Sequence, residues 1–202
     1  PSQVVSRTGY REVDLTDHVA ESKKADWGIY YRPFENNFEI SYVGKWGTGQ
    51  TVYQGTNRYG IENFTMSQHK FEVKDDNFFV RAYVTEDNAG DSYDMNFTAI
   101  NINRIWSDSG YSQGIRNGDG DNVWFGTYVN GFATATLGGA TEAQAHTVAR
   151  AGADANRVLP GTEEFDRLFQ EVVNDPDLTT GAKFQDNSKI YHSDWNYNFQ
   201  DQ

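Results

Sequence analysis

The chain has 202 residues, no Cys and a formal net charge of −12, and it is 37% hydrophobic but 15% aromatic. The acidic balance argues against general nucleic-acid binding, which depends on Lys and Arg that neutralise phosphates. The lack of Cys excludes disulfides and Cys-ligated metals, and no run of about 18 apolar residues predicts a transmembrane helix. A polar chain with many rings favours half-buried strands over buried helices.

The first predicted strands alternate between apolar and polar residues. Residues 25–32 place Trp27 and Ile29 on one face and polar side chains on the other. After a turn at residues 35–37, the segment 38–46 repeats the alternation. The two segments predict a hairpin with one apolar face and one polar face.

Turns and loops then follow in a regular rhythm. The expected elements are a polar loop, a strand, a second strand after a tight turn, another polar loop and a longer strand, at residues 47–63, 64–74, 78–84, 85–92 and 93–106. Alternating short turns and long loops are typical of outer-membrane barrels. A soluble meander would show the same alternation, so the strand pattern leaves both readings open.

Residues 107–188 predict an insert of different character. Residues 107–122 are rich in Gly, Ser, Asp and Asn and predict an exposed loop, and 123–132 fits a helix turn or a short strand. Two helices are expected, one over 140–157 with Thr141 as its N-cap and one beginning after Thr162. Long structured insertions usually carry function. Alternation resumes after residue 188, in the last predicted strand.

Side chains that could carry catalysis or hold a metal are sparse. The four His are not at metal-ligand spacing, and the paired carboxylates stand in a turn or at a helix start, so no enzyme is predicted. Asn117, Asp119 and Asp121 resemble the start of a calcium loop. The later positions of that motif are not matched, because Asn122 and Tyr128 stand where Gly and Glu are required. A solvated loop is therefore favoured, and no cofactor is predicted.

Aromatic side chains at or beyond the strand ends are better ligand candidates. Rings with neighbouring amides and an Arg suit sugars or peptides, because they combine stacking with directional hydrogen bonds. The competing explanation is an aromatic girdle that anchors strands at the membrane interface. The predicted ligand-binding residues are Tyr53, Gln54, Asn57, Arg58, Tyr59, Asp91, Tyr93, Trp106, Tyr111 and Trp124.

Five segments carry a family resemblance that covers nearly the whole chain. Residues 51–59 (TVYQGTNRY), 77–83 (NFFVRAY) and 89–94 (AGDSYD) resemble barrel segments of TonB-dependent outer-membrane receptors of the Bacteroidetes type. Residues 159–162 (LPGT) and 175–186 (DPDLTTGAKFQD) resemble the long extracellular insert of the same receptors. The resemblance implies nutrient uptake driven through TonB. This chain lacks the plug and most of the barrel of such receptors, so we expect a piece of a longer polypeptide.

The predicted fold is all-β: an antiparallel transmembrane β-barrel segment of about six strands, with a long extracellular loop that contains two short helices. We expect barrel strands and loops in 1–106, the insert in 107–188 and the start of the next strand in 189–202.

The predicted function is part of a bacterial outer-membrane receptor, whose extracellular loops capture a ligand for TonB-energised uptake. Expected partners are a nutrient (sugar, peptide or chelate), outer-membrane lipid, the remaining barrel and plug, TonB and a surface lipoprotein, but no nucleic acid. The alternatives are a soluble β-rich carbohydrate-binding module and a passive porin-like channel.

Overall fold

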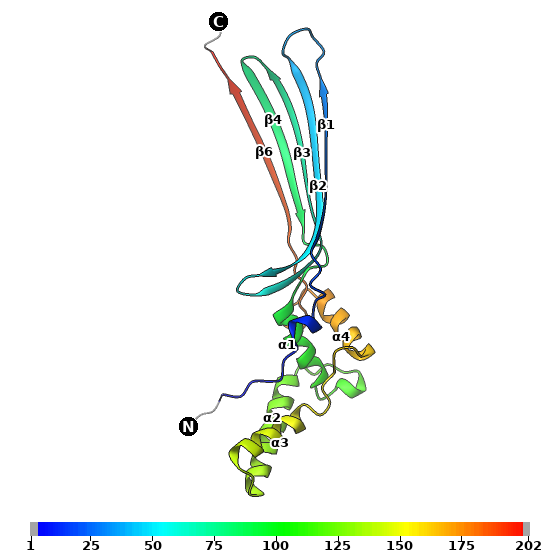
Figure 1. Cartoon of the computed structure of the whole chain (residues 1–202), viewed down its shortest axis with the longest axis vertical. Coiled ribbons are helices and arrows are strands. Elements are labelled where there is room, and N and C mark those ends of the chain that lie inside the picture. The colour runs from blue at the N-terminus through cyan, green and yellow to red at the C-terminus, as the bar shows by residue number, and fades with distance from the viewer. Residues whose placement is uncertain (1–3, 200–202) are drawn as a thin grey trace. The chain divides into compact units, whose positions relative to one another are not determined.

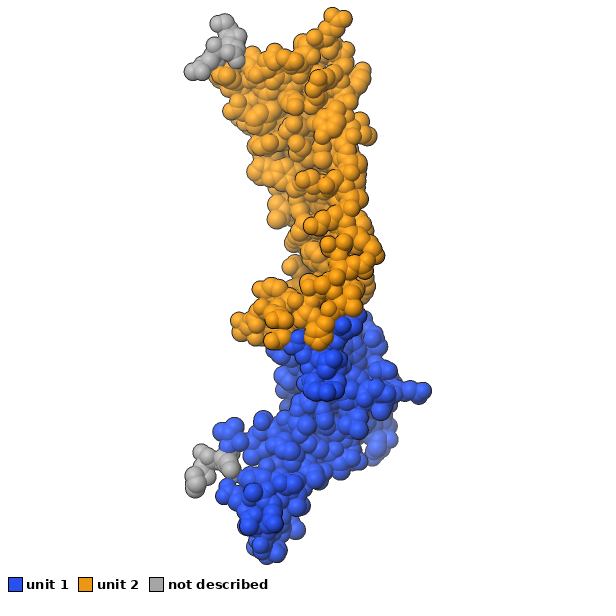
Figure 2. All heavy atoms as spheres, in the orientation of Figure 1, with its two compact units in different colours: residues 1–17, 94–183 blue, residues 18–93, 184–202 orange. Residues whose placement is uncertain are grey.

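The computed structural model describes residues 4–199, which form two compact units. The sheet unit is His18–Tyr93 with Phe184–Gln202, and the helical unit is Pro1–Asp17 with Asp94–Lys183 (Figure 2). Each unit therefore combines segments that are distant in the sequence. These boundaries differ from the predicted ones, because residues 94–106 and the N-terminal segment both belong to the helical unit.

The sheet unit is built on five long antiparallel strands in the order β1-β2-β3-β4-β6, with a short sixth strand, β5, paired to β3 (Figure 1). The bounds are β1 Glu21–Tyr31, β2 Glu39–Gln54, β3 Arg58–Asp75, β4 Phe78–Asn88, β5 Tyr93–Asp94 and β6 Asn187–Tyr197. Each long strand pairs with its neighbour in a continuous register apart from one irregularity in β2. The sheet does not close on itself, and among the described residues β1 and β6 each have a neighbouring strand on one side only.

The predicted all-β fold class is wrong. The chain is 31% helical and 36% strand, with four α-helices beside the open six-stranded sheet. Part of the error lies in residues 93–106, which were expected to be a strand but form β5 and then α1 (Met95–Trp106). The Asp94 carboxylate accepts hydrogen bonds from two backbone N–H groups of the first helical turn, and this N-cap favours a helix.

The polar stretch 47–63 is mostly strand, contrary to the predicted long loop. β2 continues to Gln54 and β3 begins at Arg58, so three residues connect them. The register shifts between Gly49 and Thr51, and a β-bulge of this kind bends a strand and increases its twist. Backbone pairing in a long hairpin therefore prevails over a composition that is typical of loops.

The helical unit contains α1, α2 (Gly120–Leu137), α3 (Glu142–Ala153) and α4 (Glu163–Asn174). The predictions for α3 and α4 are confirmed, including Thr141 and Thr162 as their N-caps. The prediction for 123–132 underestimated α2, which has 18 residues. Its apolar residues are spread around the helix rather than along one stripe, so it lacks the pattern by which amphipathic helices are recognised.

The core of the helical unit joins the four helices. Ile102 of α1 and Leu168 and Val172 of α4 are fully buried. Helices α2 and α3 pack closely at Gly131, because a Cβ there would lie 3.1 Å from the Cα of Ala149. A glycine at this crossing therefore brings the two backbones together.

Candidate functional site

The sheet has two faces of opposite character. Residues paired across strands share a face, and one face carries linked ion pairs. On this polar face Arg81 Nε lies 2.6 Å from Asp194 Oδ1, and Lys74 Nζ lies 3.1 Å from Glu39 Oε1. Arg32 also contacts Glu39, whose side chain is only 5% exposed. The polar face is therefore internally neutralised over much of its length.

The opposite face presents large apolar side chains to the outside. Nine of them are at least 40% exposed: Trp27, Ile29, Tyr31, Trp46, Phe71, Val80, Tyr191, Trp195 and Tyr197. Exposed large apolar residues on the polar face are fewer, namely Tyr30, Met66 and Ile190. A contiguous apolar surface of this kind marks a contact with another protein or with lipid.

The apolar face is a band limited along the strands. It runs from Trp46 to the row of Phe78 and Tyr197, about eight residues or roughly 26 Å of strand. The row of Trp46 is already mixed, because it also holds the ion pair between Glu86 and Lys189. Aromatic rings lie at both ends, Trp46 at one and Trp195 with Tyr197 at the other. The next row beyond Trp46 is polar. A lipid-facing band flanked by aromatic girdles has these features.

Within residues 4–199, the apolar face of the sheet has one buried glycine, Gly44, and a cluster of aromatic side chains lies around it. The Trp27 ring covers Gly44, where an added Cβ would lie 2.2 Å from the indole. The same ring meets His69 edge-on, with centroids 6.3 Å apart. His69 Nδ1 is 2.7 Å from the Tyr42 hydroxyl, so the imidazole has a polar partner on this face.

Seven of the predicted ligand-binding residues lie in the sheet unit. Tyr53, Gln54, Asn57, Arg58 and Tyr59 gather at the β2–β3 tip, where the rings of Tyr53 and Tyr59 are 6.1 Å apart. Asp91 is exposed and accepts a hydrogen bond from Asn63. Tyr93 is buried against Gly60, so its ring is not a free contact surface.

The other three predicted ligand-binding residues lie in the helical unit. Trp106 and Trp124 are 5% and 1% exposed, which makes them core residues. Tyr111 is partly exposed, and the guanidinium of Arg116 lies 5.2 Å from its ring centroid. Of the ten predicted ligand-binding residues, only the five at the β2–β3 tip lie together on the surface of one unit. Ligand binding by any of the ten stays a prediction.

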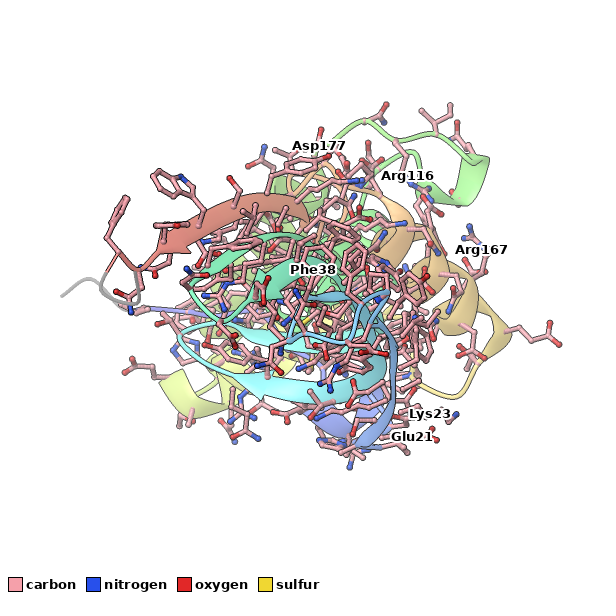
Figure 3. The ribbon with its side chains drawn as sticks, turned by 90° about the horizontal axis from the view of Figure 1, so that it is seen from above. Glu21, Lys23, Phe38, Arg116, Arg167 and Asp177 are labelled. Atoms are coloured by element: carbon pink, nitrogen blue, oxygen red, sulfur yellow. The ribbon has the colours of Figure 1, made fainter. Side chains whose placement is uncertain are left out.

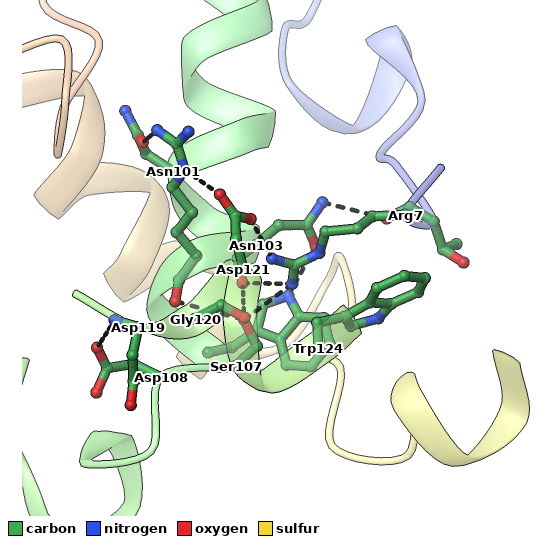
Figure 4. A network of polar contacts seen from close by, with 12 residues as sticks. Arg7, Asn101, Asn103, Ser107, Asp108, Asp119, Gly120, Asp121 and Trp124 are labelled. Atoms are coloured by element: carbon green, nitrogen blue, oxygen red, sulfur yellow. Dashed lines mark hydrogen bonds and ion pairs between the residues drawn. The ribbon is translucent and has the colours of Figure 1, made fainter. Parts of the chain in front are cut away.

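A polar network that the sequence did not indicate holds the N-terminal segment to the helices (Figure 4). Arg7 donates to Asp121 Oδ1 at 2.8 Å and to the Asn103 carbonyl at 2.8 Å. Its guanidinium carbon lies 5.3 and 5.4 Å from the ring centroids of Trp106 and Trp124. Burial lowers the pKa of Arg7, and the neighbouring Asp121 carboxylate acts against that shift. All of these groups belong to the helical unit, and their contacts hold the N-terminal segment against α1 and α2. We therefore interpret the network as structural.

Asp108 organises the loop that precedes α2. Its two carboxylate oxygens accept hydrogen bonds from the backbone N–H groups of Gly110, Asn117, Gly118 and Asp119. Burial would raise the pKa of this carboxyl, but the four donors outweigh it and the pKa lies below its usual value. Residues 112–118 of this loop are exposed, as expected, and the loop is folded around this one buried carboxylate.

We expect Asp108→Asn to lower the free energy of unfolding by about 1–3 kcal/mol at pH 7, because an amide N–H₂ would face backbone donors. The depressed pKa of Asp108 stabilises the fold above the unfolded value of about 3.9, and this contribution is lost as pH falls through the lower folded value. The difference between wild type and variant should therefore shrink in acid. Urea unfolding at neutral and acidic pH checks both points, and an equal difference at every pH would contradict the assignment.

The loop residues that resemble a calcium motif are otherwise engaged. Asp121 is bound by Arg7 and Arg104, and Asp119 accepts from the N–H and hydroxyl of Ser109. Asn117 donates to the hydroxyl of Ser109. Within residues 4–199, no group of three or more His, Cys, Asp or Glu side chains is placed to hold a metal ion.

None of the helices in the described part of the chain combines the length and apolarity that crossing a bilayer requires. Comparison with protein-family models, with curated proteins and with solved structures found no match.

Proposed function

We propose that this chain is part of a bacterial outer-membrane receptor that captures a nutrient for TonB-energised uptake. The observation that carries the proposal is the two-faced sheet, with its apolar face exposed between aromatic rows. In water, such a face would be an aggregation surface. In an outer membrane, the same side chains contact lipid, and the ion-paired face lines an aqueous interior.

The edges of the sheet support the same proposal. β1 and β6 are regular 11-residue strands, and neither has Pro or a register shift that would block further pairing. Soluble proteins usually protect such edges with Pro, bulges, a covering element or charged side chains. Of these devices, the two strands themselves carry only charged residues, such as Lys23, Lys24 and Lys189. Further strands of the receptor would satisfy these backbone groups, as a bilayer requires. The proposed ligand-capturing elements are the β2–β3 tip and the helical unit.

The matched pairs Ile29/Tyr30 and Tyr191/Ile190 give a direct test. Members of each pair are neighbours on opposite faces, and their exposures are similar: 66% and 63% in the first pair, 74% and 59% in the second. The chain contains no Cys, so single Cys variants can carry a nitrobenzoxadiazole label. In proteoliposomes, nitroxide-bearing lipids should quench the label at Ile29→Cys and Tyr191→Cys, and leave Tyr30→Cys and Ile190→Cys bright.

Equal quenching at both members of each pair would refute the membrane placement. So would a folded monomer in buffer without detergent, which is the result expected of a soluble carbohydrate-binding module. Co-purification of the intact outer-membrane protein with the periplasmic domain of TonB separates an energised receptor from a passive channel. If the protein does not bind TonB, the proposal of energised uptake fails, but the proposed outer-membrane placement is unaffected.

A further inference from the structure

The polar face of the sheet contains a furrow of about 480 Å³ along β2. Two glycines, Gly47 and Gly49, form its floor, because they leave two successive positions of this face without side chains. The register places Lys24 and Ser22 of β1 beside them on one side. Met66 and Phe64 of β3 stand beside them on the other side. The furrow therefore has one polar wall and one apolar wall.

Polar groups close one end of the furrow. The next row of the sheet contains Asp26, Lys45, Gln68 and Thr85, all of which line the furrow, and it ends at Ile190 of β6, which does not. Gln68 Nε2 donates to the Thr85 hydroxyl at 3.2 Å, which leaves the Gln68 carbonyl oxygen available to a ligand. The arrangement places hydrogen-bonding and charged groups at one end and the two apolar side chains further along.

The two lysines of the furrow differ from the other cations of the sheet. Lys23, Lys70, Lys74, Arg81 and Lys189 each contact a carboxylate. Among the described residues, neither Lys24 nor Lys45 has a carboxylate oxygen within 4.0 Å, although Asp26 lies directly opposite Lys45 in the register. In a chain with 29 acidic and 17 basic residues, two cations without an ion pair at diagonal positions of neighbouring strands are a specific feature.

We propose that this furrow binds an organic anion that carries an apolar body. The anionic head lies between the ammonium groups of Lys24 and Lys45, where charge-assisted hydrogen bonds are stronger than neutral ones. The apolar body lies over Gly47 and Gly49 and packs on Met66 and Phe64. This binding activity goes beyond the proposed receptor function and does not depend on which surface the opposite face contacts.

The two methionines of the chain make the test specific. Met66 is in the furrow, and Met95 is 3% exposed in the core of the helical unit. In protein labelled with ¹³C at the methionine methyl groups, 4-phenylbutyrate should shift the Met66 signal in a saturable way and leave the Met95 signal unmoved. The matched neutral compound 4-phenylbutan-1-ol and acetate, which lacks the apolar body, should each bind at least about tenfold more weakly.

Charge variants assign the anionic head to its partners. Lys24→Gln and Lys45→Gln should each raise the Kd for 4-phenylbutyrate roughly threefold to tenfold, and Asp26→Asn should lower it. Lys23→Gln is the matched control, since Lys23 is adjacent in sequence but faces the other way and pairs with Glu21 at 2.9 Å (Figure 3). Its Kd should equal that of the wild type.

Two results would overturn the assignment: equal affinity for the acid and the alcohol, or an unchanged Kd in both furrow lysine variants. Failure of the lipid-quenching test with an intact Met66 response would refute the membrane placement and leave the furrow standing. The reverse pattern would refute the furrow and leave the receptor proposal standing.

Discussion

Replacing Trp124 with Ala should lower the free energy of unfolding of the helical unit by about 3–5 kcal/mol, the usual cost of emptying a buried aromatic site. Trp124 is 1% exposed and stacks on Tyr128 with centroids 5.3 Å apart. Its indole N–H donates to Asp154 at 2.8 Å. The variant also removes one of the two rings that flank the Arg7 guanidinium. Urea unfolding followed by the helical circular dichroism signal measures the loss.

The neighbouring residue provides the control for this substitution. Phe125 is 39% exposed and meets Trp124 edge-on, with centroids 4.9 Å apart. Phe125→Ala should therefore lower the free energy of unfolding by less than Trp124→Ala does, about 1–2 kcal/mol, because much of the Phe125 side chain stays in contact with water after folding. If the two variants were equally destabilised, Trp124 would not be the centre of the helical core.

Two glycines of α2 should respond to alanine in opposite directions. At Gly120, the first residue of the helix, an added Cβ would lie 1.9 Å from the carbonyl oxygen of Arg104. Backbone atoms must move to accept it, so Gly120→Ala should destabilise the helical unit by about 1–3 kcal/mol or more. At Gly126, no atom lies within 4 Å of the added Cβ, and Ala is the better helix former, so Gly126→Ala should stabilise by about 0.5–1 kcal/mol.

Gly120 begins α2 and Gly126 lies inside it, so the gain in helix propensity applies mainly to Gly126. A loss of stability in Gly120→Ala therefore reports the contact between the start of α2 and Arg104 near the end of α1. Thermal unfolding of both proteins under one condition is sufficient. A stabilising effect at both positions would show that this contact is loose.

Sequence patterns predicted the parts of the fold whose signals are local. β1 and β6 alternate cleanly because one face of each strand is apolar, and the period of two is visible without knowledge of neighbours. Helices α3 and α4 were predicted from their capping threonines and the residues that follow them. In both cases, a few adjacent residues determine the structure.

The missed features depend on partners that are distant in sequence. The apolar alternation of residues 93–99 predicts a strand, although four buried residues of α1 follow helical spacing: Met95, Thr98, Ile102 and Trp106. The extension of β2 and β3 depends on their pairing with each other, and polar composition concealed it. The furrow had a local signal in the alternation of Gly47 and Gly49, but its two walls come from other strands.

The insertion of the helical unit between β4 and β6 has a consequence for how the chain folds. Ser188 donates to Asp87, a residue 101 positions earlier. Beyond this pair, the crossing segments remain hydrogen-bonded, through Ala89 to Asp186 and Phe184 to Ser92. If residues 94–183 fold first, their two ends come together, and the conformational entropy of closing that loop is lost in this step rather than when β6 pairs with β4. β6 then joins β4 almost as the second arm of a hairpin, and we expect the final pairing to be fast only in chains whose helical unit has already formed.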